Sequence, residues 1–166
     1  MIVKVQQEDF NPMAEMAAFP LDAIAGAGGS VTFIVGSEMC IRDSDYSEAA
    51  DILAMEIEHY PGMTERELER IGAEAARHYD ILDSLVIHRY GHLAPQDNIV
   101  MVAVWSRHRA AAFDACRFLI DALKTSAPFW KKEITPEGVR WVTDCPGCRT
   151  GSREGHTHVS HSHTHS

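Results

Sequence analysis

Three lysines surround a proline and two aromatic side chains in the stretch KTSAPFWKKE, residues 124–133. A pocket for an anionic ligand that contains a ring would need both kinds of side chain. Lysines held in a partly dry pocket stabilise developing negative charge, and a desolvated lysine beside other cations can also transfer protons. Lys124 and Lys131 are candidates for this role. The alternative is a pair of lysines that complement a helix dipole and face water.

Two further features of this stretch have more than one interpretation. Phe129 and Trp130 could stack on a ligand, but core packing after a helix is favoured for at least one of the two rings. Glu133 could orient Lys131, or it could be an ordinary surface carboxylate. Lys132 is expected to be solvated.

A second basic pair, His108 and Arg109, begins a predicted helix. Free backbone N–H groups at a helix N-terminus favour an anion, and the arginine fork suits a phosphate. An exposed first turn is the alternative interpretation. A basic pair in that turn opposes the helix dipole, however, and this cost favours a bound anion.

The composition of the chain limits its class. It has 166 residues, a formal net charge of −9 and 45% hydrophobic residues. This predicts one soluble domain without general affinity for nucleic acid. No apolar run approaches the ~20 residues of a membrane span, and residues 1–10 lack the features of a signal peptide. The expected location is cytoplasmic, with no membrane partner.

Strand and helix patterns alternate along the chain and predict a mixed α+β domain. Residues 30–35 are expected to pair with residues 52–58. Residues 84–90 and 98–105 are joined by a turn-rich linker, so an antiparallel pair is expected. The predicted strands are 2–5, 30–35, 52–58, 84–90, 98–105 and 139–143, and the predicted helices begin near residues 12, 64 and 106.

Each predicted helix has a start or stop signal. Asn11 is a candidate N-cap for the first helix, and Thr64 with Glu67 has the spacing of a capping box for the second. Ser106 is the candidate cap of the third, which should end near Lys124. Its expected buried face is Phe113, Cys116, Ile120 and Leu123.

The last residues differ from the rest of the chain. Residues 1–144 form the predicted domain, whereas 145–166 have no apolar periodicity and are expected to be a disordered tail rich in cysteine and histidine. Cys145 and Cys148 form a CxxC, and thiolate with imidazole suits a borderline metal such as zinc. There is no second CxxC, so only weak or incidental metal binding is expected, with no catalytic metal and no cofactor.

Several long blocks resemble one known family, the large, catalytic subunit of molybdopterin synthase. They are EHYPGMTERELERI, VIHRYGHL and DNIVMVAVWSRHRAAAFDACRFLIDALKTSAPFWKKE, and the resemblance runs from about Val31 to Val142. It implies an α/β hammerhead fold with an additional antiparallel sheet. It also implies a sulfurtransferase that converts cyclic pyranopterin monophosphate (precursor Z) to molybdopterin, in molybdenum cofactor biosynthesis.

The resemblance further implies partners and site residues. Family members form a homodimer with a ubiquitin-like small subunit at each end, and that subunit's C-terminal Gly-Gly thiocarboxylate supplies the sulfur. Lys124 and Lys131 match the family's active-site lysines. His108 and Arg109 match a pair that binds the anionic part of the substrate, and a position across the dimer interface is one option. From their local patterns alone, His59 in the turn block EHYPGM and His88 in a predicted strand are expected to be structural.

Arg42 matches a substrate-binding arginine in a short motif of the family, here IRD at 41–43. The preceding VGSEMC is extra relative to that pattern, so residues 35–41 are expected to form an exposed excursion. A non-catalytic metal-binding or scaffold paralogue that uses the tail is the alternative function. Such a protein could lose Lys124, Lys131, His108 and Arg109, yet this chain keeps all four.

Overall fold

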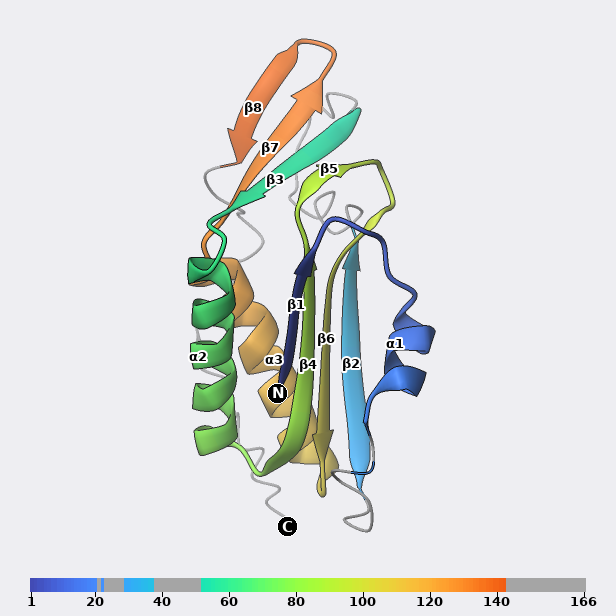
Figure 1. Ribbon diagram of the computed structural model, residues 1–166, viewed down its shortest axis with the longest axis vertical. Helices are drawn as coiled ribbons and strands as arrows, with labels where there is room; N and C mark the ends of the chain where they lie inside the picture. The colour runs from blue at the N-terminus through green and yellow to red at the C-terminus, as the bar shows by residue number, and fades with distance from the viewer. Residues whose placement is uncertain (21, 23–28, 38–51, 143–166) are drawn as a thin grey trace, which may run out of the picture.

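The computed structural model describes residues 1–20, 22, 29–37 and 52–142, which form three helices and eight strands in two sheets (Figure 1). The elements are β1 (Ile2–Gln6), α1 (Pro12–Ala18), β2 (Ser30–Ser37), β3 (Ala54–His59), α2 (Met63–His78), β4 (Ile81–Arg89), β5 (Gly91–Leu93), β6 (Asn98–Ser106), α3 (Arg109–Thr125), β7 (Phe129–Thr135) and β8 (Gly138–Val142).

The first sheet has the strand order β1-β4-β6-β2 and carries helices on both faces (Figure 1). Strand β1 runs parallel to β4, and the other two pairings are antiparallel. The predicted pairing of residues 84–90 with 98–105 is confirmed by the register, in which Ser84 lies opposite Val104 and Val86 opposite Val102.

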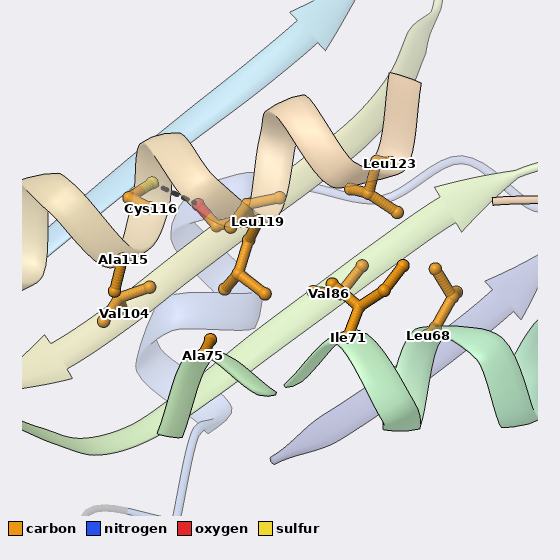
Figure 2. Close-up of a cluster of buried hydrophobic side chains, with 10 residues drawn as sticks. Leu68, Ile71, Ala75, Val86, Val104, Ala115, Cys116, Leu119 and Leu123 are labelled. Carbon is orange, nitrogen blue, oxygen red and sulfur yellow. Dashed lines mark hydrogen bonds between the residues drawn. The ribbon is translucent and has the colours of Figure 1, made fainter. Parts of the chain in front are cut away.

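Alternating side chains of the first sheet build two apolar cores. One core lies under α2 and α3 (Figure 2) and consists of Leu68, Ile71, Ala75, Val86, Val102, Val104, Ala115, Cys116, Leu119 and Leu123. The other lies on the side of α1 and consists of Phe10, Phe19, Leu85, Ile87, Met101, Ala103 and Trp105. Helix α3 is therefore fixed along its length against the sheet.

The second sheet is antiparallel, has the order β5-β3-β7-β8, and lies beyond one end of the first (Figure 1). A small core of Met55, Ile57, Leu93 and Ile99, with Phe129 packed against it, joins the two sheets. The predicted α+β class with an additional antiparallel sheet is confirmed. Within the described part of the chain, no helix is long and apolar enough to cross a membrane.

The predicted pairing of residues 30–35 with 52–58 is wrong. Strand β2 pairs with β6 in the first sheet, and β3 pairs with β5 and β7 in the second. Strand β7 was not predicted at all, because its sequence FWKKEIT contains three charged residues in a row. Pairing between distant strands depends on tertiary packing, which local patterns do not report.

The expected excursion at residues 35–41 is also wrong at its beginning. Val35 and Gly36 continue β2 and lie opposite Met101 and Val100, and Ser37 follows after a shift in register. The remaining residues of that segment, with Arg42, lie outside the described residues.

The observed N-termini of the three helices confirm one predicted N-cap, Asn11, and correct the other two, Thr64 and Ser106. Asn11 is the N-cap of α1, since its Oδ1 accepts hydrogen bonds from the N–H groups of Met13 and Ala14 at 3.0 and 3.1 Å. Thr64 is not a cap, because α2 begins earlier and the buried Thr64 hydroxyl donates to the Tyr60 carbonyl oxygen at 2.9 Å.

Helix α3 begins three residues after Ser106, and His108 occupies its N-cap position. The Ser106 hydroxyl accepts a hydrogen bond from the His108 N–H at 3.2 Å, so it supports the turn before the helix. The predicted buried face holds for Cys116 and Leu123, whereas Phe113 is 60% exposed. The buried face instead follows Ala112, Ala115, Cys116, Leu119 and Leu123.

Candidate functional site

Lys124 lies where α3 meets the second sheet. It is an exposed residue in the last turn of the helix, which ends at Thr125. The Ser126 N–H donates back to the Ala122 carbonyl oxygen at 2.8 Å and closes that turn. A cation at this end complements the partial negative charge of the helix C-terminus. Only residues 126–128 separate α3 from β7, so this short connection determines the approach of the two elements.

Lys131 lies on β7, beyond the same short connection. It is partly buried, and its backbone lies opposite Ile57 of β3 and Val142 of β8. Because side chains alternate along a strand, Lys131 shares one face of β7 with Phe129 and Glu133. The structure thus brings Lys124 and Lys131 to the same end of the molecule, one on each side of the α3–β7 connection.

The two aromatic residues of the stretch have different environments. The Phe129 ring stacks on the His88 ring at a centroid distance of 3.7 Å, and it packs against the cores of both sheets. The core interpretation is therefore confirmed for Phe129. Trp130 lies on the other face of β7, is 43% exposed, and meets Tyr60 edge to face at 5.6 Å.

Two ion pairs lie on opposite faces of β7. Glu133 is 2% exposed and pairs with Arg140 of β8, whose Nε donates to Glu133 Oε2 at 3.0 Å. The interpretation of Glu133 as a surface carboxylate is therefore wrong. Lys132 pairs with Glu58, and its Nζ lies 4.4 Å from the centroid of the Trp141 ring, so it is not simply solvated.

His88 is the most strongly perturbed histidine among the described residues. It is 4% exposed on β4, and burial lowers its pKa to about 3, with the charges of Lys131 and His59 acting in the same direction. The ring is therefore neutral at physiological pH. Its structural role was expected from the sequence, but its contact with Phe129 and its proximity to Lys131 could not be seen there, because β4 and β7 are far apart in the chain.

Acid is expected to destabilise the protein through His88. An unfolded histidine binds its proton below about 6.5, whereas folded His88 binds it only near about 3. The unfolded state therefore takes up the extra proton as pH falls below 6.5, and stability decreases toward pH 3. Between pH 7 and pH 5 the loss from this residue should be about 2 kcal/mol.

Urea unfolding at the two pH values measures this loss. His88→Phe should lose about 2 kcal/mol less than the natural chain between pH 7 and pH 5, because its buried ring does not titrate. The control is His92→Gln, at an exposed position on β5, which should behave like the natural chain. An equal loss in all three proteins would contradict the assignment.

His108 and Arg109 lie at the opposite end of α3 from Lys124. Both are exposed, and the first turn of the helix contains no acidic residue. Lys124 lies fifteen positions after Arg109 in the helix, which at 1.5 Å per residue is roughly 22 Å. The structure confirms that this basic pair begins the helix, but one chain does not bring it together with the two lysines.

Cysteine chemistry and metal binding have little support in the described part of the chain. Cys116 is buried, its Sγ contacts the Val102 carbonyl oxygen at 3.8 Å (Figure 2), and burial raises its pKa to about 11. Among residues 1–20, 22, 29–37 and 52–142, no three acidic, histidine or cysteine side chains are grouped to hold a metal. Cys145 and Cys148 lie outside this part.

Comparison with known proteins gives a consistent picture. The family profile of the MoaE protein matches residues 5–126, a range that contains His108, Arg109 and Lys124. A protein of Cereibacter sphaeroides named molybdopterin synthase catalytic subunit is 49% identical over 142 residues, which cover 86% of this chain and 91% of that protein.

Two solved structures share the fold. The molybdopterin biosynthesis MoaE protein from Burkholderia ambifaria is 46% identical with a TM-score of 0.67, and the match covers 86% of this chain and 89% of that one. The molybdopterin synthase from Staphylococcus aureus is 26% identical with a TM-score of 0.72, covering 85% and 96%.

Proposed function

The chain belongs to the MoaE protein family, and we propose that it is the catalytic subunit of a molybdopterin synthase. The observation that carries the proposal is the pair of lysines on either side of the α3–β7 connection, in a chain 49% identical to a protein of that name. The substrate in this proposal is cyclic pyranopterin monophosphate (precursor Z). The sulfur donor is a ubiquitin-like small subunit with a C-terminal Gly-Gly thiocarboxylate.

Sulfur transfer of this kind produces negative charge that the lysines can stabilise. The thiocarboxylate sulfur forms a bond to a substrate carbon, the bond from that carbon to oxygen breaks, and this oxygen leaves as water or stays with the phosphate group. Water then hydrolyses the acyl–sulfur bond. The sulfur stays on the substrate as a thiolate, and the small subunit is left with a carboxylate. Oxyanions and thiolates develop in both steps, so preorganised cations at Lys124 and Lys131 would lower both barriers. Two such transfers complete the dithiolene.

The substrate phosphate requires a further cationic site, for which His108 and Arg109 are the candidates. The separation of roughly 22 Å along α3 places them too far from Lys124 of the same chain to bind one small substrate. We therefore propose that each active site combines Lys124 and Lys131 of one protomer with His108 and Arg109 of a second protomer. Arg42 is kept as a proposed substrate-binding residue from the family pattern.

A reconstituted assay tests the proposed function. The chain is mixed with a thiocarboxylated small subunit and precursor Z, and molybdopterin is measured. Product should form only when both proteins are present, because the sulfur comes from the small subunit. A well-characterised molybdopterin synthase serves as the positive control. No product in a mixture where that synthase works would overturn the proposal and favour a non-catalytic paralogue.

Cys116 should not carry sulfur in this reaction. A thiol with a pKa of about 11 is almost entirely protonated at neutral pH, and the thiolate is the nucleophile. Cys116→Ala is therefore expected to keep at least half of the turnover, with a stability loss of about 1 kcal/mol. Native Cys116 should also resist alkylation by iodoacetamide, as mapped by mass spectrometry. Complete loss of turnover in a folded Cys116→Ala protein would contradict this expectation and indicate a direct role for the Cys116 thiol.

A further inference from the structure

Imidazole and aromatic side chains pack against one another where β7 of the second sheet meets β4 of the first. His88 on β4 lies against Phe129 with ring centroids 3.7 Å apart and planes inclined by 13°. His59, at the end of β3, lies 6.3 Å from Phe129 and 4.3 Å from Tyr90, also between ring centroids. Because His88 is 4% exposed and Phe129 packs into both cores, neither ring can turn without disturbing its neighbours.

The hydrogen bond of His88 fixes which ring nitrogen carries the proton. Nδ1 lies 2.8 Å from the Arg89 carbonyl oxygen. A carbonyl oxygen only accepts hydrogen bonds, so Nδ1 must be the donor. The buried ring is neutral, because its pKa is about 3. The second nitrogen, Nε2, therefore has no proton and acts as an acceptor.

Lys131 is the cation placed to use this acceptor. It lies two residues from Phe129 on the same face of β7, so its side chain projects beside the ring that stacks on His88. Lys131 lies close enough for its positive charge to act on the imidazole, and this charge contributes to the lowered pKa of His88. His59 acts on the pKa of His88 in the same direction as Lys131.

We propose that His88 is a positioning residue for Lys131: its neutral ring, held against Phe129, offers Nε2 as a hydrogen-bond acceptor to the Lys131 amine. This inference rests on the proposed function, in which Lys131 acts on the reacting groups. A neutral acceptor orients the ammonium group without neutralising it, unlike a carboxylate. This contact would hold the Lys131 amine in one direction for the reacting groups.

The first test measures protonation of Lys131 without using activity. Amine labelling with acetic anhydride across a pH series, read by mass spectrometry, gives the midpoint at which Lys131 becomes reactive. Loss of a hydrogen bond to the ammonium form should lower this midpoint by about one pH unit in His88→Phe. His88→Gln, whose amide oxygen can replace the acceptor, should restore it. Lys132, labelled in the same samples, is the internal control and should not change.

A second measurement keeps His88 intact, in case His88→Phe does not fold. In ¹⁵N NMR spectra the Nε2 signal of His88 should move downfield in Lys131→Met, since an acceptor nitrogen loses its donor. Nδ1 should not move, because it still donates to the Arg89 carbonyl. An unchanged Lys131 midpoint in folded His88→Phe, or an unchanged Nε2 signal in Lys131→Met, would overturn the inference.

Steady-state kinetics then connect the contact with catalysis. In folded His88→Phe, kcat should fall about tenfold or more while KM changes less than about threefold, and the alkaline limb of the pH profile should move to lower pH. A purely structural role would lower only the amount of folded enzyme. If the natural chain itself made no molybdopterin, the proposed function would fail, whereas the labelling and NMR results would still decide the role of His88.

Discussion

Replacing Lys124 by alanine is expected to lower the turnover of molybdopterin formation by about 10²- to 10³-fold, which is the usual effect of removing a preorganised group from a developing anion. The protein should remain folded, because Lys124 is exposed at the end of α3 and contributes nothing to the buried face of the helix. The measurement is kcat with saturating small subunit and precursor Z, together with the melting temperature. Lys131→Ala should have a comparably severe effect.

Lys132→Ala provides the matched control for this experiment. Lys132 has the same charge and is adjacent to Lys131, but it lies on the other face of β7, where it contacts Glu58 and Trp141. Its loss should change kcat less than about threefold, because exposed ion pairs contribute little. Near-normal turnover by folded Lys124→Ala, or an equal defect in Lys132→Ala, would contradict the assignment of Lys124 to the active site.

Two inactive variants are expected to recover activity when they form mixed dimers. Lys124→Ala and Arg109→Ala are co-expressed with different tags, so that random association makes about half of the dimers mixed. In the proposed arrangement, one active site of a mixed dimer carries both defects and the other carries neither. About one quarter of all sites should then be intact, and kcat should return to about one quarter of the natural value. Purification through both tags should raise this fraction to about one half.

The matched control combines two variants at the same end of α3. Lys124→Ala with Lys131→Ala should give no recovery, because each proposed active site takes both lysines from one protomer and so would always have one defect. If His108 and Arg109 acted within their own chain instead, Lys124→Ala with Arg109→Ala would also show no recovery. That result would contradict the proposed site between protomers.

The sequence predicted local structure more successfully than strand partners. The N-cap at Asn11 and the antiparallel pair of residues 84–90 and 98–105 depend on neighbouring residues, and both predictions are confirmed. Strand β7 was missed because it has three charged residues in a row, and one of them, Glu133, is buried in the fold. Glu133 is tolerated inside only because Arg140 of β8 neutralises it, and that partner is brought in by folding.

The candidate site shows the same contrast between local features, which the sequence predicts, and contacts between distant elements, which it does not. The types and positions of Lys124, Lys131, His108 and Arg109 came from the sequence and its family resemblance, and the structure places Lys124 at the end of α3 and the His-Arg pair at its start. The stack of His88 on Phe129 joins strands of different sheets, so no spacing along the chain could predict it. The distance between the two ends of α3 follows from the number of residues in the predicted helix, so the sequence could have given it.

Helix α3 has consequences for how members of this family can diverge. Its buried face fits the sheet residue by residue, and its two ends carry the proposed site residues. A substitution on the buried face alters one contact. A one-residue deletion would instead rotate everything beyond it by about 100° and shift Lys124 by about 1.5 Å. Evolution can therefore change the composition of this helix gradually, but a change in its length would disrupt the core and both ends at once.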